Sequence, residues 1–134
     1  MLTAKRILLV EDDIDDQWLF IKALSLTHPD LEYAIANNGI EALSFIKSSP
    51  PFDIIFLDLN MPLMDGYECL INLKRDKQYK YVPVIVLSTS SNEKDKEKCK
   101  TLGAATFYTK PNSFIKLFSD LKNILTSMVH YEPS

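Results

Sequence analysis

The chain has 134 residues, of which 46% are hydrophobic and 25% are charged, and its formal net charge is -3. This length and composition predict one globular domain with its own core and exclude an intrinsically disordered chain. The acidic balance, with lysines interleaved among acids, argues against a nucleic-acid-binding surface.

Short apolar runs alternate with segments of helical periodicity along the chain. The apolar runs predict five strands, and the amphipathic segments that follow them predict five helices. In chain order we expect strand 5–10, helix 14–27, strand 31–36, helix 40–47, strand 54–57, helix 67–74, strand 82–87, helix 93–102, strand 104–109 and helix 113–128.

Five strand–helix repeats predict an α/β fold whose parallel sheet is covered by helices on both faces. Right-handed crossovers make it a doubly wound (βα)5 fold of the flavodoxin-like type, with strand order 2-1-3-4-5. The segment 76–81 is predicted to be a polar loop, and the helix at 93–102 has little apolar surface. One stripe of the first helix is predicted to contain Ile14, Trp18, Ile21, and Leu24 or Ser25.

Polar side chains follow four of the predicted strands. Glu11 and Asp12 follow the first strand, Asp58 ends the third, Ser88 follows the fourth and Lys110 follows the fifth. Because the carboxyl ends of parallel strands meet at one edge of a sheet, these groups can converge. Three carboxylates close together repel, and a hard divalent cation such as Mg²⁺ removes the conflict.

A lysine and a hydroxyl opposite such an acid cluster suit an incoming anion. Together with the metal they predict a site for a phosphoryl group, and the sequence has no P-loop glycines that would cradle a nucleotide. The central carboxylate, Asp58, is the group that can take the phosphoryl group covalently.

Each residue alone also has an ordinary structural explanation. Glu11 and Asp12 could favour a helix N-terminus, Asp58 could form a turn, Ser88 could be a loop hydroxyl and Lys110 a solvated lysine. Their joint occurrence at four strand ends favours the functional interpretation.

Four segments resemble the receiver domain of two-component response regulators, and the resemblance covers nearly the whole chain. They are VEDD at 10–13, FLDLNMPLMDG at 56–66, VIVLSTS at 84–90 and FYTKP at 107–111. The polar insertion at 76–81 and the STS sequence at 88–90 are also similar to chemotaxis-regulator-like, single-domain regulators that pair with phytochrome-type kinases.

The resemblance implies a metal-dependent phosphoacceptor site. Asp58 corresponds to the phosphoacceptor aspartate. Glu11 and Asp12 correspond to the acidic pair, with Asp12 a direct Mg²⁺ ligand and Glu11 acting through water. Asn60 matches the position whose backbone carbonyl completes the metal site.

Of the remaining signature positions, Ser88 and Lys110 are implied to bind the phosphoryl group, and Ser88 and Phe107 to form a switch. Ser88 moves to bind a phosphoryl oxygen, Lys110 pairs with the phosphoryl group, and Phe107 turns inward when Ser88 moves. Pro111 matches a proline that is usually preceded by a cis bond in this family. Ser88 and Phe107 replace the commoner Thr and Tyr, so the hydroxyl is kept at the first position and lost at the second.

The resemblance also implies the organisation and partners of the protein. Residues 1–129 form the receiver domain and 130–134 a short tail. The expected phosphodonor is a sensor histidine kinase or a histidine phosphotransfer protein. The expected output is contact with a protein target through the fourth helix, fifth strand and last helix, without catalysis on other substrates. Direct DNA binding is not expected, and homodimer formation stays open.

The cellular compartment can be inferred from the lack of membrane-spanning and signal segments in the sequence and from the spacing of its cysteines. No stretch is long enough to span a membrane and none fits a signal peptide, so a cytoplasmic location is expected. Cys69 and Cys99 lack metal or redox spacing and are predicted to be free thiols.

Three other classes can be weighed. A haloacid-dehalogenase-like phosphatase needs a second aspartate where this chain has Asn60. A flavodoxin needs a phosphate loop after the first strand, where the acids of this chain would repel phosphate. A pseudo-receiver, a phosphorylation-independent interaction module, is the alternative that stays open; partner binding unchanged by Asp58→Asn would favour it.

Overall fold

The computed structural model describes residues 6–61 and 63–128. In this part of the chain the strands are β1 (Arg6–Val10), β2 (Glu32–Ala36), β3 (Ile54–Asp58), β4 (Val84–Ser88) and β5 (Thr106–Thr109). The helices are α1 (Ile14–Thr27), α2 (Gly39–Ser48), α3 (Gly66–Arg75), α4 (Glu93–Thr101) and α5 (Phe114–Met128). This is the predicted succession of elements; the predicted tail at 130–134 lies outside the described residues.

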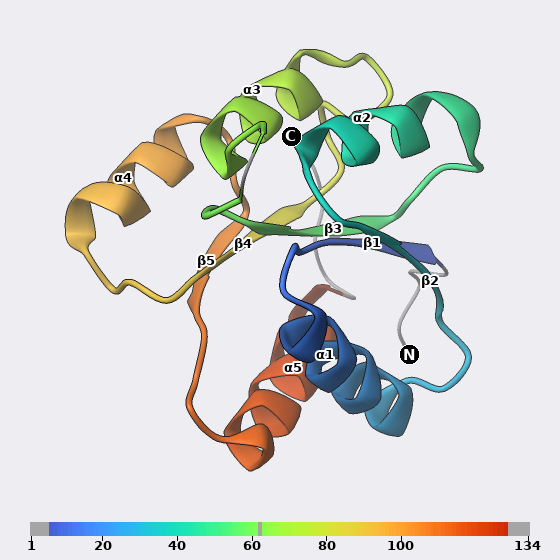
Figure 1. The fold of residues 1–134 in the computed structure, drawn as a ribbon, viewed down its shortest axis with the longest axis vertical. Helices are drawn as coiled ribbons and strands as arrows, with labels where there is room; N and C mark the ends of the chain where they lie inside the picture. Colours follow the sequence, from blue (N-terminus) through green and yellow to red (C-terminus); the bar gives the residue numbers. More distant parts are fainter. Residues whose placement is uncertain (1–5, 62, 129–134) are drawn as a thin grey trace.

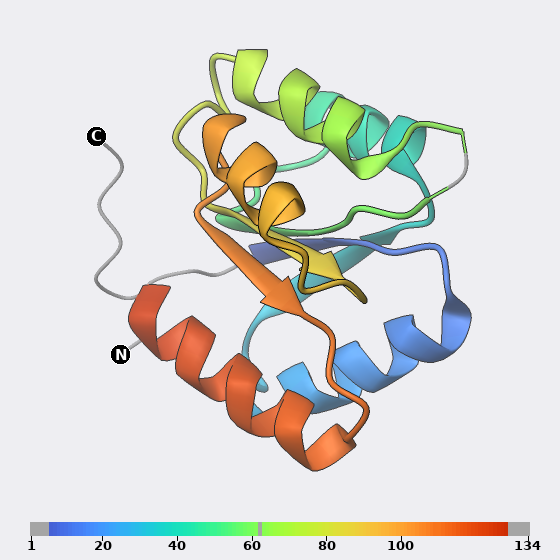
Figure 2. The ribbon, with the colours of Figure 1, turned by 90° about the vertical axis from the view of Figure 1, so that its left-hand side faces the viewer.

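The five strands form one parallel sheet in the order β2-β1-β3-β4-β5, which confirms the predicted flavodoxin-like topology. Helices α2, α3 and α4 lie on one face of the sheet, and α1 and α5 lie on the other (Figures 1 and 2). Register matches align the strand ends: Val10 lies opposite Leu57, Asp58 opposite Leu87, and Ser88 opposite Thr109. No helix in the described ranges has the length and apolar character needed to cross a bilayer.

The sheet divides the buried side chains into two clusters. Successive strand residues point to opposite faces, so Leu8 and Leu57 pack toward α2 and α3, whereas Leu9 and Phe56 pack toward α1 and α5. Strands β3 and β4 are buried along their whole length, as expected for central strands covered on both sides.

Side-chain caps explain where four helices begin. In each, an aspartate or asparagine just before the helix accepts a hydrogen bond from a backbone N–H of the first turn, satisfying a donor that has no partner within the helix. These capping residues are Asp13, Asn38, Asp65 and Asn92. Helix α4 is followed by Gly103, whose φ of 102° suits glycine after a helix end.

Two details differ from the expectations. The predicted stripe of α1 is only partly buried: Leu24 is 1% exposed, but Ile14 and Trp18 are 77% and 61% exposed, and the helix also buries Phe20 and Ala23. The segment 76–81 is not simply a polar loop, because Tyr79 is fully buried in it and its hydroxyl accepts a hydrogen bond from a backbone amide at 3.2 Å.

Candidate functional site

Three carboxylates meet at the carboxyl edge of the sheet. Glu11 and Asp12 follow β1, and Asp58 ends the neighbouring strand β3. One oxygen atom from each carboxylate lies within 4.8 Å of those of the other two. Glu11 and Asp58 are only 2% and 3% exposed, whereas Asp12 is open to solvent. The structure therefore brings together the three acids that the sequence had assigned to one site.

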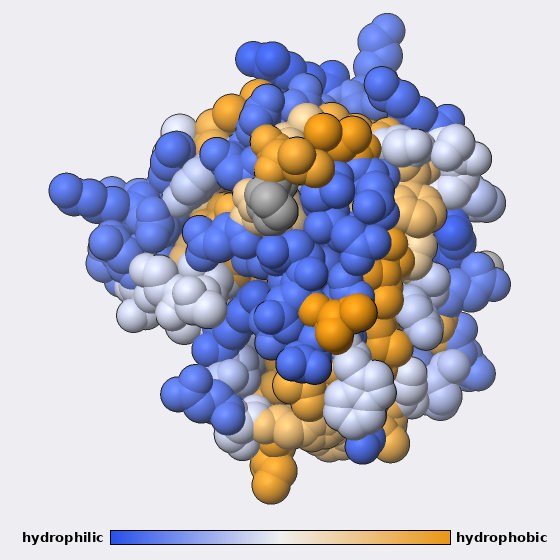
Figure 3. All heavy atoms as spheres, in the orientation of Figure 1, coloured by the Kyte–Doolittle hydropathy of each residue, from blue (hydrophilic) through white to orange (hydrophobic). Residues whose placement is uncertain are grey.

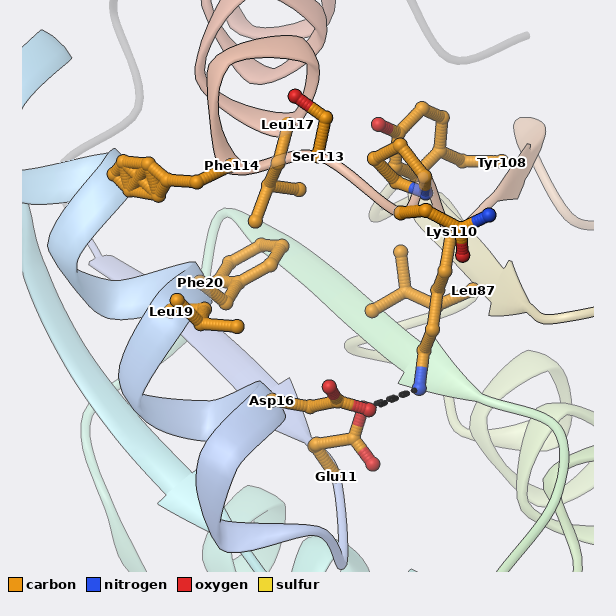
Figure 4. Close-up of a pocket in the computed structure, with 12 residues that line it drawn as sticks. Glu11, Asp16, Leu19, Phe20, Leu87, Tyr108, Lys110, Ser113, Phe114 and Leu117 are labelled. Atoms are coloured by element: carbon orange, nitrogen blue, oxygen red, sulfur yellow. Dashed lines mark hydrogen bonds and ion pairs between the residues drawn. The ribbon is translucent and has the colours of Figure 1, made fainter.

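Lys110, which follows β5, extends its ammonium group into this cluster. Its Nζ donates to Glu11 Oε1 at 2.6 Å and to Asp16 Oδ2 at 3.2 Å, and lies 3.7 Å from Asp58 Oδ2. Figure 4 shows the lysine side chain reaching toward the Glu11 and Asp16 carboxylates. The Lys110 ammonium is thus within 4 Å of three carboxylates, those of Glu11, Asp16 and Asp58.

Burial and neighbouring charges change the protonation of the site. Burial, followed by a hydrogen bond with Asp58, raises the pKa of Glu11 to about 8, against the opposing effect of Lys110. Burial acts to lower the pKa of Lys110, but the hydrogen bond and charge of Glu11 outweigh it and raise this pKa. All the ligand atoms on offer are carboxylate oxygens, which is the donor set that suits a hard divalent cation.

The loop after β3 holds Asp58 in place. Asp58 Oδ1 accepts a hydrogen bond from the Asn60 backbone N–H at 3.1 Å. The first residue of α3, Gly66, donates its N–H to the Leu59 carbonyl at 2.9 Å. A Cβ atom on Gly66 would lie 2.4 Å from Leu59 Cα and 2.5 Å from the Asp58 carbonyl oxygen, so only glycine fits here. Helix α3 thus begins directly against the backbone that carries Asp58.

Ser88 lies at the end of β4, next to β3 in the sheet. It is 1% exposed, and its hydroxyl accepts a hydrogen bond from the Ser90 backbone N–H at 3.0 Å. Its carbonyl accepts from the Lys110 N–H at 2.7 Å, which joins the loops after β4 and β5. In this structure the Ser88 hydroxyl is engaged in its own loop.

The switch residue Phe107 lies on β5, and Pro111 lies just after this strand. Phe107 is half-buried and packs against the cluster on the α2–α3 side of the sheet, away from the acids. The expectation of a cis bond before Pro111 is wrong for this structure, because no described peptide bond is cis. The trans form is the intrinsically favoured isomer of X–Pro bonds, and here Lys110 reaches the acids with that isomer in place.

Asp16 was not among the predicted site residues. Its side chain nevertheless accepts a hydrogen bond from Lys110. Its position in the sequence, one helical turn after Asp12 and at the start of the same helix, could have indicated that Asp16 lies near the acids. Beyond this ion pair lies an apolar cavity of about 90 Å³ between α1 and α5, with Phe20, Leu87 and Leu117 among its lining residues (Figure 4).

Comparisons with known proteins agree on one family. The family model described as "Response regulator receiver domain" matches residues 7–122. The chain is 36% identical over 126 residues to "Response regulator Rcp1" of Synechocystis sp., covering 90% of this chain and 86% of the relative.

Two solved structures have the same fold. The phosphorylated cyanobacterial phytochrome response regulator RcpA is 36% identical with a TM-score of 0.83, and the alignment covers 90% of each chain. The Mn²⁺-bound form of response regulator Rcp1 is 33% identical with a TM-score of 0.85, covering 97% of this chain and 99% of the other.

Proposed function

This chain belongs to the response regulator receiver family, and we propose that it accepts a phosphoryl group on Asp58 from a phosphohistidine of a sensor kinase or phosphotransfer protein. Receiver domains are signalling domains that interact with histidine kinases and downstream targets. The observation that carries the proposal is the buried Asp58 carboxylate, which lies 3.7 Å from the Lys110 ammonium in a cluster of three acids.

Receiver domains bind a divalent metal, and the proposed ion here is Mg²⁺. Glu11, Asp12, Asp58 and the backbone carbonyl of Asn60 would hold it, with Glu11 acting through water. The ion supplies positive charge that neutralises the acids and the oxygens of the transferring group. The close approach of the three carboxylates supports this assignment, because one oxygen of each lies within 4.8 Å of those of the other two.

The transfer is an in-line substitution at phosphorus. An Asp58 carboxylate oxygen forms the new P–O bond while the P–N bond to the histidine breaks, and the imidazole nitrogen keeps the electron pair. The products are an aspartyl phosphate and a free histidine. Lys110 then leaves Asp16 to pair with the phosphoryl oxygens, and the Ser88 hydroxyl turns from its loop to donate to one of them.

The proposed output is a change in the α4-β5-α5 face. Helix α4 buries a single residue, Cys99, and the Tyr67 hydroxyl of α3 donates to its Asp95 at 2.8 Å. When Ser88 moves toward the phosphoryl group, Phe107 fills the space behind it, and this biases a pre-existing equilibrium of the α4 loop. Hydrogen exchange measured over 93–109 should change on activation, and unchanged exchange would contradict this output surface.

The remaining assignments complete the proposal. We place the receiver domain at residues 1–129, the protein in the cytoplasm, and its output in contact with another protein rather than with DNA. The excess of acids over bases is the observation that supports the last point.

The phosphoacceptor is tested by intact mass. The protein is incubated with Mg²⁺ and acetyl phosphate beside the Asp58→Asn variant, with EDTA as a second control. One added phosphoryl group that needs Mg²⁺ and is absent in the variant is expected. An unmodified wild type that also fails to bind beryllofluoride would contradict the proposal and favour the phosphorylation-independent pseudo-receiver.

A further inference from the structure

The loop after β4 connects Ser88 to the start of α4 through successive hydrogen bonds. The Ser88 hydroxyl accepts from the Ser90 N–H at 3.0 Å, and the Ser90 hydroxyl accepts from the Asn92 N–H at 3.0 Å. The Asn92 side chain then caps α4 by accepting from the Lys94 N–H at 2.8 Å. The first turn of α4 is therefore connected to the hydroxyl that we expect to bind a phosphoryl oxygen.

The first turn of α4 is also bound from another side, by α3. The Tyr67 hydroxyl donates to Asp95 Oδ1 at 2.8 Å, and the Lys98 ammonium lies 3.9 Å from the centre of the Tyr67 ring. Asp95 and Lys98 are three residues apart, so they share one side of α4. We call Tyr67, Asp95 and Lys98 the α3–α4 clasp. Its hydrogen bond has a charged acceptor, and such bonds are stronger than those between neutral groups.

The α3 end of the clasp is fixed. Tyr67 is half-buried and packs against the cluster on the α2–α3 side of the sheet. It directly follows Gly66, whose N–H donates to the Leu59 carbonyl at 2.9 Å. Tyr67 is thus attached to the backbone next to Asp58 and has little freedom to follow a movement of α4.

Helix α4, by contrast, has little packing of its own. Of its nine residues, all of which the structure describes, one is buried, Cys99. Figures 1 and 2 show α4 beside α3 on the same face of the sheet, and Figure 3 shows mainly hydrophilic surface over α4, at the left of the view. Because few buried apolar contacts hold this helix, the clasp contributes much of what keeps it in position.

The two connections respond differently to a phosphoryl group on Asp58. The proposed turn of the Ser88 hydroxyl breaks its bond with the Ser90 N–H and frees the loop that leads to α4. The clasp stays closed, because its three side chains are not among those assigned to phosphoryl transfer. A closed clasp keeps the first turn of α4 at α3 and so opposes the shift of this helix.

We propose that the α3–α4 clasp is an autoinhibitory contact, which holds α4 in its unphosphorylated position and opens when α4 shifts. The proposal rests on the proposed function, because it takes the shift of α4 as the output. It adds to the expected switch of Ser88 and Phe107 a separate restraint that passes through α3. A contact made only in the unphosphorylated state lowers the affinity for the phosphoryl group, so Tyr67 sets how readily this chain is activated.

The first test is a calorimetric titration of beryllofluoride at saturating Mg²⁺. Tyr67→Phe keeps the ring and its contact with Lys98 but removes the hydroxyl, and it should raise the affinity about 2- to 10-fold. Asp95→Ala should raise the affinity too, and Tyr67→Phe should add nothing further in that background, since both substitutions remove the same bond. Tyr81→Phe, at a ring that is 50% exposed and outside the clasp, is the matched control.

The second test needs no mimic of the phosphoryl group. Amide hydrogen exchange over 93–101 in the unliganded protein should be faster in Tyr67→Phe than in the wild type and Tyr81→Phe, because α4 is held less firmly. Equal exchange in all three, an affinity that Tyr67→Phe leaves unchanged or lowers, or effects that add in the double variant would overturn the proposal. A wild type that binds no beryllofluoride contradicts the phosphoacceptor assignment instead, and the exchange measurement then decides whether the clasp restrains α4.

Discussion

Replacing Asp16 by asparagine should make the protein bind a phosphoryl group more readily. In the unphosphorylated state the Lys110 ammonium lies 3.2 Å from Asp16 and 3.7 Å from Asp58. Pairing with a phosphoryl group on Asp58 requires Lys110 to give up Asp16. The Asp16 pair therefore stabilises only the unphosphorylated state, and its removal favours the phosphorylated one.

The magnitude follows from the exposure of Asp16. Its side chain is 44% exposed, so the pair is screened by water, and pairs of this kind contribute about 0.2–1 kcal/mol. This free energy corresponds to an increase of about 1.4- to 5-fold in affinity for beryllofluoride, a mimic of the phosphoryl group.

The assay is a calorimetric titration of beryllofluoride at saturating Mg²⁺. Asp15→Asn is the matched control, because it removes the same charge one residue away, where the side chain is exposed and has no hydrogen bond to Lys110. Affinity in Asp16→Asn equal to or below that of Asp15→Asn would refute the idea that Asp16 restrains Lys110.

Three further outcomes are expected. Tyr79→Phe should cost about 1–3 kcal/mol of unfolding free energy in a urea titration, because a buried amide loses its acceptor, whereas Tyr81→Phe, at a ring 50% exposed, should cost little. Gly66→Ala should cost about 1–3 kcal/mol because its Cβ meets backbone, and Gly39→Ala less because its Cβ meets a flexible side chain. Mg²⁺ affinity should rise with pH up to about 8, where Glu11 becomes ionised, and a pH-independent affinity in calorimetry would contradict this.

The raised pKa of Glu11 also predicts how the stability of the metal-free protein depends on pH. The pKa of Glu11 is raised from 4.5 to about 8, so the native state keeps a proton that the unfolded chain releases. The metal-free protein should therefore lose stability as pH rises between these two values. Thermal melts in EDTA measure this loss. Glu11→Gln should flatten this dependence, and a wild type that gains stability over the same range would contradict the assignment.

The sequence predicted the fold and the acid cluster because both depend on order along the chain. Five strand–helix repeats leave few topologies, and that topology places every strand end at the same edge. The order of the strands alone could therefore place Glu11, Asp12 and Asp58 in one site. In the structure, one carboxylate oxygen of each lies within 4.8 Å of those of the other two.

The features that were predicted incorrectly or not at all share one physical cause. Each depends on how helices, strands and loops face one another in space. Helix α1 has apolar residues on two sides, so periodicity alone could not tell whether Trp18 or Phe20 packs on the sheet. Asp16 joins the site only because the side chain of Lys110, which follows β5, extends to the first turn of α1. Tyr79 was hidden by polar neighbours, although its ring is fully buried.

The division of the interior by the sheet has a consequence for how such a protein can change over generations. Among the described residues, the clusters on the two faces have no side chain in common: Phe56 belongs to one and Leu57 to the other. Substitutions in separate clusters are expected to act additively. During evolution, substitutions can thus adapt the surface carried by α1 to a new binding partner while the surface carried by α4 is unchanged. No compensating substitutions across the sheet are needed.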